Sequence, residues 1–223
     1  MARVYLSPSK QFNNAYAWGN TTEGEQCGKI GTACKAALER CGIEVMMEHK
    51  GVEIEDRCKH SNAWGADLHV PIHTNAYNGR VSGTRMFCYN SSGNGYKACK
   101  AIFDVLAPIS PGTSESIKAS PGLYEVRAAA APTAYIEVDF HDVPSVAQWI
   151  VEHTTEIGEA IAHGICNYFG IAYKKPAQPE TTPADTGDKL YRVQVGAYAV
   201  RANAENMLAK LKAAGFSGFI KQD

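Results

Sequence analysis

The sequence of 223 residues has no long apolar run and no excess of charge of either sign. A membrane-spanning helix needs about 18 or more consecutive apolar residues, so we expect none. The 22 basic and 23 acidic side chains give a net charge of −1. This balance predicts neither nucleic acid nor membrane insertion. The first residues lack the features of a secretory signal, so we expect synthesis in the cytoplasm and exit by another route.

Cysteine pairs at metal-binding spacing are also missing. The chain has seven cysteines, an odd number, and none forms a Cys-x-x-Cys pair. Cys27, Cys34 and Cys41 are spaced seven residues apart, which places them on one face of a helix. We interpret the cysteines as small buried hydrophobic residues in a reducing compartment. Disulfides and a zinc–thiolate site are the alternatives.

Strand-like and helix-like segments alternate along the first 170 or so residues. Thr22 is a suitable N-cap for the first helix, and Gly42 a suitable stop. This alternation predicts an α/β domain with a mostly parallel sheet flanked by helices on both faces. The expected strands cover residues 4–6, 43–47, 68–72, 83–89 and 134–140, and the expected helices cover 23–41, 54–64, 96–106 and 145–169.

The composition changes after residue 173. Residues 174–188 contain three prolines and no large apolar side chain, which is typical of an extended, solvated linker. The next segment, 189–223, contains a strand-like stretch, an amphipathic helix and a second strand-like stretch. We therefore predict a domain at 1–173, a linker at 174–188 and a small β-α-β appendage at 189–223. The appendage is too short to bury a good core alone and is a candidate for the front half of an incomplete domain.

Two ionisable side chains occur at the ends of apolar strand-like segments. His73 follows residues 68–72, and Glu137 interrupts a run of apolar and β-branched residues. Burying such groups is costly unless they have a partner or a role. The carboxyl ends of parallel strands meet at one edge of a sheet, where Glu23, at the start of the first helix, could join them. Zinc takes about three protein ligands and activates water for a nearby base, so we predict Glu23 and His73 as zinc ligands and Glu137 as the general base.

The residues around His73 and Glu137 resemble the zinc-dependent N-acetylmuramoyl-L-alanine amidases. The segment Pro71–Ala76 is similar to the Ser-Ile-His-x-Asn-Ala motif of that family, and Tyr135–Phe140 is similar to the segment that carries its catalytic glutamate. The resemblance covers roughly residues 3–172. It implies a zinc enzyme that cleaves peptidoglycan at the amide between N-acetylmuramic acid and L-alanine, with Glu137 as catalytic residue.

The loop after the first strand departs from that family. The family usually has Asp-Pro-Gly-His-Gly-Gly there, and its histidine binds zinc. Here the loop has Lys10 at the aligned position, and an amine must lose a proton before it can bind metal. The opening Leu-Ser-Pro-Ser-x-Gln resembles a branch of clostridial and phage-type lysins. We predict Gln11 as the third zinc ligand, through its amide oxygen, with His69 and His141 as alternatives.

The appendage resembles the first half of a SPOR (sporulation-related) repeat. The similarity lies in Tyr191–Tyr198, Asn203–Glu205 and Leu211–Phe216. That module binds septal peptidoglycan, so the resemblance implies a second contact with the cell wall. A lysin without a signal would act at the wall after lytic or holin-type release.

Two other functions stay open at this point. The missing histidine is also consistent with a wall-binding protein whose catalytic site is degenerate. The same zinc chemistry would also serve a peptidase that cuts within the stem peptide. Arg127 is a candidate for gripping a peptide carboxylate, although a surface salt bridge is its simpler role.

Overall fold

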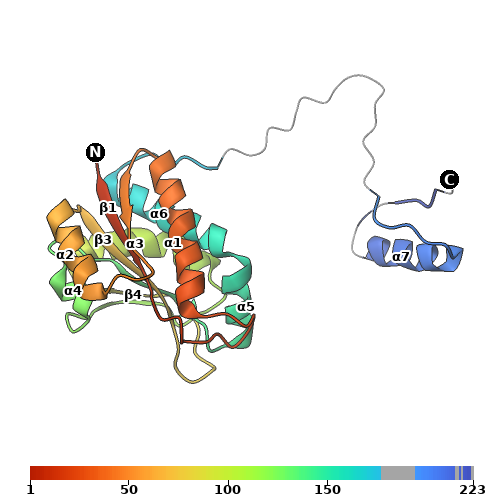
Figure 1. Cartoon of the computed structure of the whole chain (residues 1–223), viewed down its shortest axis with the longest axis horizontal. Helices are drawn as coiled ribbons and strands as arrows, with labels where there is room; N and C mark the ends of the chain where they lie inside the picture. The colour runs from red at the N-terminus through yellow and green to blue at the C-terminus, as the bar shows by residue number, and fades with distance from the viewer. Residues whose placement is uncertain (177–193, 214–215, 217, 222–223) are drawn as a thin grey trace, which may run out of the picture. The chain divides into compact units, whose positions relative to one another are not determined.

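A computed structural model describes residues 1–176, 194–213, 216 and 218–221 of the chain. The chain divides into two compact units, Met1–Pro176 and Ala177–Asp223 (Figure 1). In the described residues no helix has the length and apolar character needed to cross a membrane.

A six-stranded sheet forms the centre of the first unit, in the order β2-β1-β3-β6-β4-β5. Neighbouring strands run parallel except β4 and β6, which are antiparallel. The mostly parallel sheet predicted from the sequence is thus confirmed. The strands are β1 (Arg3–Pro8), β2 (Glu44–Met47), β3 (Leu68–Asn75), β4 (Arg85–Cys88), β5 (Ser116–Ala119) and β6 (Tyr135–Phe140).

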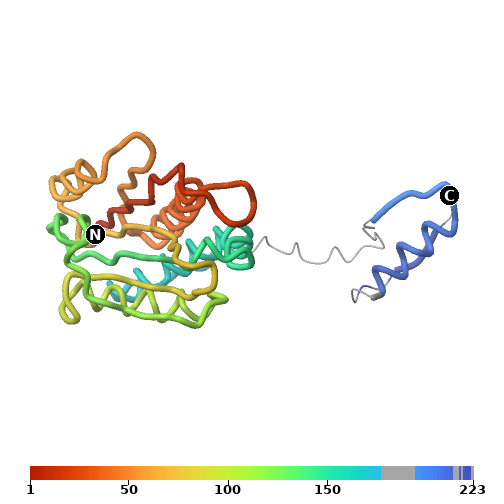
Figure 2. Tube along the Cα trace, turned by 90° about the horizontal axis from the view of Figure 1, so that it is seen from below, coloured from red at the N-terminus to blue at the C-terminus, as the bar shows by residue number. Residues whose placement is uncertain are grey.

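Helices cover both faces of this sheet, as expected. Helices α1, α3 and α6 pack together on one side, while α2 and α4 contact each other on the other (Figure 1). The Cα trace shows α2, in orange, and α3, in yellow-green, at opposite margins of the unit (Figure 2). The bounds are α1 (Glu23–Arg40), α2 (Ile54–Trp64), α3 (Gly93–Leu106), the 3-10 turn η1 (Ala107–Ile109), α4 (Tyr124–Ala128), α5 (Pro144–Glu152) and α6 (Thr154–Phe169).

Alternation along the strands separates an apolar face from a polar one. Leu6, Val70 and Ile136 are fully buried and belong to the core that also contains residues of α1, α3 and α6. The residues between them point to the opposite face. There His69, on β3, bonds to Ser61 of α2. The polar and ionisable side chains of the strands therefore lie on the face that carries α2 and α4.

The first helix begins where the sequence predicts. Thr22 accepts a hydrogen bond from the backbone of Glu25, and the Glu25 side chain accepts one from the backbone of Thr22. This capping box satisfies two backbone donors that would otherwise be orphaned at the helix start. It fixes Glu23, the first residue of α1, at the edge of the sheet.

The prediction of one helix over 145–169 is wrong, because the structure has two. His153 leaves the helical conformation, with φ −121° and ψ 20°, and its ring nitrogen bonds to the carbonyl of Trp149 at 2.7 Å. The side chain thus adds to the backbone N–H of His153, which also donates to the carbonyl of Trp149 at 3.0 Å, at the end of α5. The sequence analysis also missed three short elements, η1, β5 and α4, which are too brief to show a periodic pattern.

The second unit contains helix α7 (Arg201–Ala213), close to the amphipathic segment that the sequence indicates. No strand is found among its described residues 194–200, 216 and 218–221. The other residues of the two predicted strands lie outside the described part of the chain. Two short strands bury little surface, so a sheet of this size is only marginally stable in water.

Candidate active site

Three predicted site residues meet at the carboxyl end of the parallel strands. Glu23 begins α1, His73 lies near the end of β3, and Glu137 lies on β6 with its Cα paired to that of His73. His73 Nδ1 donates to Glu23 Oε1 at 2.9 Å. Glu23 and His73 are 50 positions apart in the sequence, and His73 and Glu137 are 64 positions apart. The order of the strands in the sheet therefore brings the three residues together.

The Glu23 carboxylate is almost fully buried, with 1% of its surface exposed. Burial alone would raise its pKa, but hydrogen bonds from His73, Ser9 and Asn14 lower the pKa below the ordinary value. Asn14 Nδ2 donates to Glu23 Oε2 at 2.6 Å. The carboxylate is thus held in its charged, metal-binding form at the positive end of α1.

The His73 imidazole is fixed from two sides. Its ring stacks on that of Tyr135, with centroids 4.7 Å apart and planes 15° from parallel. Burial would lower its pKa, but the hydrogen bond to Glu23 and the charges of Glu137 and Glu23 raise the pKa above the ordinary value. The two carboxylates therefore create a site that attracts a cation.

Glu137 has the opposite electrostatic character to Glu23. Its Oε2 is shielded from solvent and has no hydrogen-bond partner among the described residues. The pKa of this carboxyl is raised to about 7, mainly by burial. The negative charge of Glu23 also raises the pKa, while the positive charges of His73 and Arg85 lower it. A carboxyl with a pKa near neutrality can both accept and return a proton at physiological pH.

A bulge in β6 follows directly after Glu137. Two positions of β3, from His73 to Asn75, span three positions of β6, from Glu137 to Phe140. Such an extra residue turns the bulged strand and redirects its side chains, and bulges are common beside active sites. It brings Phe140 towards the polar face, where its ring lies 5.0 Å from the Arg85 guanidinium carbon.

The structure explains the lysine at the position of the family's histidine. Lys10 forms an ion pair with Glu53, the residue before α2, and not with Glu23. The next residue, Gln11, contacts the site instead, with its Nε2 3.4 Å from Glu23 Oε1. The oxygen and nitrogen of the Gln11 amide are nearly equal in size, so a half-turn of the amide group brings its oxygen to this position.

His69, an alternative third ligand, belongs to a different cluster. It is fully buried, and its two ring nitrogens contact Ser61 Oγ at 3.0 Å and Glu125 Oε1 at 3.2 Å. Ser7 donates to the same Glu125 oxygen at 2.5 Å. With Cys58, His69 and Glu125 place three ligand-type atoms within 4.8 Å of one another.

Two centres can therefore be compared for metal binding. In the Cys58–His69–Glu125 cluster, burial raises the pKa of the Cys58 thiol to about 12, and both nitrogens of His69 are already satisfied. A thiol must lose its proton to bind metal. In the Glu23–His73 pair, the Glu23 carboxylate is held in its charged form by donors from His73 and Asn14, and the buried Glu137 oxygen beside them lacks a partner among the described residues. The second donor set fits a catalytic ion better.

His141, the other alternative third ligand, contacts the candidate site through Asn14 and Thr74. Its Nε2 donates to Asn14 Oδ1 at 3.3 Å, and Thr74 Oγ1 lies 2.9 Å from its Nδ1. The ring stacks on Tyr16 at 4.7 Å, and burial lowers its pKa. Asn14 in turn bonds to Glu23, so His141 positions the Glu23 carboxylate through Asn14.

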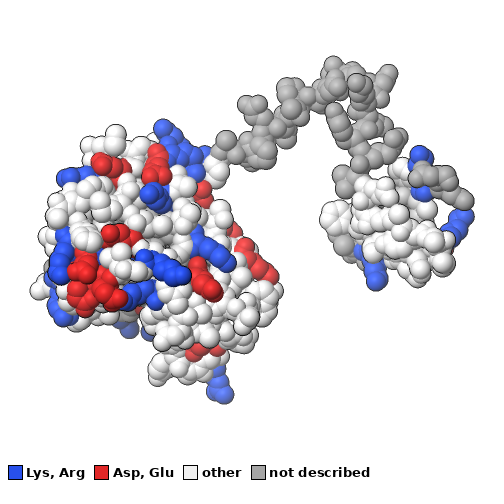
Figure 3. All heavy atoms as spheres, in the orientation of Figure 1, with Lys and Arg blue, Asp and Glu red and all other residues white. Residues whose placement is uncertain are grey.

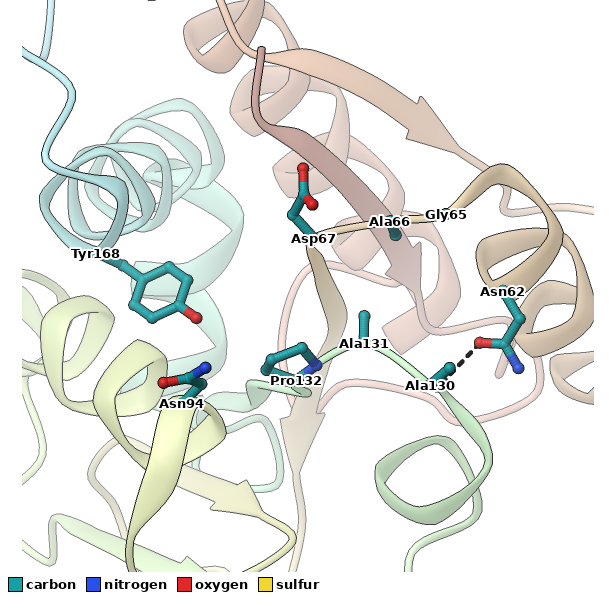
Figure 4. Close-up of a pocket in the computed structure, with 9 residues that line it drawn as sticks. All are labelled: Asn62, Gly65, Ala66, Asp67, Asn94, Ala130, Ala131, Pro132 and Tyr168. Carbon is teal, nitrogen blue, oxygen red and sulfur yellow. Dashed lines mark hydrogen bonds between the residues drawn. The ribbon is translucent and has the colours of Figure 1, made fainter.

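A hollow of about 340 Å³ lies at the opposite edge of the sheet (Figure 4). Asp67 and Pro132, which line it, come just before β3 and β6, so it is at the amino ends of these strands. Its wall is tied by the bond from the backbone of Ala130 to Asn62 Oδ1 at 2.7 Å. Asn62 thus has a structural role, and the hollow is separate from the Glu23–His73 pair.

Sequence reasoning missed the roles of three residues at the site. Asn14 and Arg85 contact or face the predicted residues but belong to no motif. Tyr135 opens the motif segment Tyr135–Phe140, but its stacking on His73 was not predicted. Their roles depend on strand pairing and loop conformation, which a single sequence does not reveal. Arg127, by contrast, donates to the carbonyl of Gly122 and lies over the Tyr124 ring, and it forms no salt bridge among the described residues. Its role in gripping a peptide carboxylate stays a prediction.

The layered α/β fold, with an imidazole and two carboxylates of opposite character at the strand ends, defines a hydrolytic enzyme. The profile of the N-acetylmuramoyl-L-alanine amidase family (Amidase_3) matches residues 9–167, and that of the SPOR domain matches residues 175–222. The chain belongs to the N-acetylmuramoyl-L-alanine amidase family. The predicted activity, cleavage of peptidoglycan by an amidase, is confirmed, and a purely wall-binding protein is not favoured.

Relatives of known function support this placement. The chain is 23% identical over 226 positions to the sporulation-specific N-acetylmuramoyl-L-alanine amidase of Bacillus subtilis (strain 168), covering 99% of this chain and 84% of the relative. It is 24% identical over 230 positions to the amidase CwlM of Bacillus licheniformis, covering 99% and 85%.

Solved structures share the fold. The catalytic domain of CwlV, an N-acetylmuramoyl-L-alanine amidase from Bacillus (Paenibacillus) polymyxa var. colistinus, has a TM-score of 0.69 at 16% identity and covers 77% of this chain and all of that domain. The catalytic domain of the endolysin CD27L, which targets Clostridia difficile, has a TM-score of 0.63 at 19% identity, covering 75% and 98%. At these identities the likeness shows the fold alone.

Proposed function

We propose that this amidase is zinc-dependent and that Glu23, His73 and Gln11 hold the ion. The supporting observation is the 2.9 Å separation of Glu23 Oε1 and His73 Nδ1, beside the unpartnered buried oxygen of Glu137. An imidazole and two oxygen donors are ligands that catalytic zinc accepts, with a further position left for water. Zinc bound there polarises the amide carbonyl and makes water more acidic.

Glu137 is the proposed general base and acid. Its carboxylate accepts a proton from the attacking water, whose oxygen adds to the carbonyl carbon of the muramoyl group. The carboxyl then gives that proton to the amide nitrogen as the carbon–nitrogen bond breaks. The products are a muramic acid with a free carboxyl group and a peptide with a free L-alanine amino terminus. A pKa of about 7 suits both transfers.

Metal analysis of matched variants tests the ligand set. Purified wild type should contain about one zinc per chain, while Glu23→Ala and His73→Ala should lose the ion and wall lysis together. Gln11→Ala should weaken binding. Variants Cys58→Ala and His69→Phe serve as controls from the other cluster. Zinc that is lost in these controls but retained without His73 would show that the ligand assignment is wrong.

Product analysis on isolated walls tests the bond. New amino-terminal L-alanine is expected. New amino termini from later residues would mean a peptidase, and new reducing ends would mean a glycosidase. An unaltered wall, with no zinc, would mean that the lysine at the family's histidine position has abolished catalysis.

We also propose a domain assignment for the chain: a catalytic domain at 1–173, a linker at 174–188 and a wall-binding segment at 189–223. The SPOR match at residues 175–222 supports a second contact with peptidoglycan glycan. Sedimentation with purified walls should bring down more of the full chain than of residues 1–176. Equal sedimentation would mean that the second unit does not bind the wall.

A further inference from the structure

Arg85 faces the candidate active site from the neighbouring strand. It lies on β4, which is antiparallel to β6, and its Cα is paired with that of Glu137. Residues directly opposite each other in such a pair point to the same face of the sheet. Phe87, two residues on, confirms the orientation, because its ring meets the edge of Tyr135 with centroids 6.2 Å apart.

The Arg85 guanidinium has no ion pair in the part of the chain that the structure describes. Its Nε is shielded from solvent and lacks a hydrogen-bond partner there. The only described anchor for the group is the Phe140 ring, 5.0 Å away, which holds it by a cation–π contact. A guanidinium presents five donors in a rigid fork. Leaving one buried and unpaired costs free energy, so these donors are available for a ligand.

The surroundings of Arg85 leave room for such a ligand. Helices α2 and α4 contact β3 side chains on this face, whereas Phe87 on β4 is only partly buried and Lys118 on β5 is exposed. Lys118 is paired with Phe87, so it shares the face with Arg85. On the face of the first unit that Figure 3 shows, basic and acidic side chains lie beside one another. Arg85 thus lies opposite Glu137, and Lys118, opposite Phe87 on the next strand, adds a second positive charge on the same face; neither forms a salt bridge in the part of the chain that the structure describes.

We propose that Arg85, assisted by Lys118, binds a carboxylate of the peptide that leaves during the reaction. This inference rests on the proposed function, because it identifies the group recognised at the same site. The glycan of the substrate is a poor ligand for a guanidinium, whereas a carboxylate matches its fork with two parallel hydrogen bonds. Arg85 is therefore a specificity residue that places the scissile amide against Glu137.

The test compares two probes that differ only in charge. One is N-acetylmuramoyl-L-alanyl-D-glutamate, which has two free carboxylates, and the other is its diamide. Wild type should favour the dicarboxylate in kcat/KM, and Arg85→Gln should lose about 10- to 100-fold on this probe, the range expected for a charge-assisted pair. On the diamide the same variant should change only through the altered pKa of Glu137, which loses the charge of Arg85, so the ratio of the two kcat/KM values is the readout. The kcat/KM of Arg85→Lys for the dicarboxylate should fall between those of wild type and Arg85→Gln.

Lys97→Gln is the matched control for loss of one positive charge. Lys97 is exposed on α3, which packs on the other face of the sheet. It should leave the preference for the dicarboxylate unchanged. Equal losses by Arg85→Gln on both probes, or none on either, would overturn the proposal.

A binding measurement separates this inference from the assignment of the reaction. Calorimetric titration of both probes into Glu137→Gln, and into Glu137→Gln combined with Arg85→Gln, requires no turnover. The dicarboxylate should bind about 10- to 100-fold more weakly to the double variant, and the diamide equally to both. If wild type fails to release L-alanine peptides, the amidase mechanism fails, and this titration still decides whether Arg85 recognises a carboxylate.

Discussion

Replacing Glu137 by glutamine should abolish activity and, in the metal-free protein, increase stability at high pH. The folded protein raises the pKa of Glu137 from its ordinary 4.5 to about 7, mainly through burial. Between these two pH values the unfolded chain has already released a proton that the folded chain retains. Raising the pH therefore favours unfolding, so the stabilising contribution is complete below pH 4.5 and is lost as the pH rises through 7.

The magnitude follows from the same pKa. Each pH unit between the folded and unfolded values corresponds to about 1.4 kcal/mol, which gives a ceiling of about 3 kcal/mol. Partial access of solvent reduces this, and we expect about 1–3 kcal/mol. Glutamine has no charge to bury, so the free energy of unfolding of Glu137→Gln, relative to wild type, should rise by this amount between pH 5 and pH 8.

Urea unfolding in the presence of a chelator measures the effect. The three tryptophans, Trp18, Trp64 and Trp149, all lie in the first unit, so their fluorescence reports its unfolding without interference from the second. Glu44→Gln, at an exposed position on β2, provides the control. Parallel pH profiles for wild type and Glu137→Gln would refute the claim that the fold opposes the charge on Glu137.

Three further outcomes are expected. Lys10→Gln should change zinc content and wall lysis less than about twofold, because Lys10 pairs with Glu53 rather than with the site; metal analysis and turbidity assays measure this. Thr22→Ala should lower the free energy of unfolding by about 1 kcal/mol through loss of the capping box, as urea titration would show. Glu125→Ala should cost about 2–4 kcal/mol, because it leaves His69 buried without its partner, yet zinc per folded chain should not change.

The fold could be predicted from the sequence wherever a segment is long and periodic. The range of α2, Ile54–Trp64, was predicted to the residue, and Gly65, in the left-handed conformation, ends it. The ranges of β1, β2 and β3 were predicted within a few residues from their apolar runs. Short elements such as β5 carry no such pattern. The break at His153 was not predictable either, because it depends on one side chain bonding to its own helix.

The site was predictable only in part, for a related reason. Glu23, His73 and Glu137 stand out because each is an ionisable residue at the end of an apolar segment or the start of a helix. Their convergence required a parallel sheet, which the alternating pattern predicts. The role of Arg85 follows instead from the antiparallel pairing of β4 with β6, and a sequence gives no signal for which strands become neighbours.

The seven buried thiols have a practical consequence for measuring motion in this enzyme. All are free and shielded, and burial raises the pKa of Cys27, Cys34 and Cys58, so they react poorly with alkylating reagents while the fold is closed. Labelling then proceeds only when the surrounding element opens. Because the thiols are distributed over α1, α2, β4, α3 and α6 and the turn after α1, timed alkylation read by mass spectrometry would rank these elements by their opening rates. The wild-type chain thus carries its own set of probes for local unfolding.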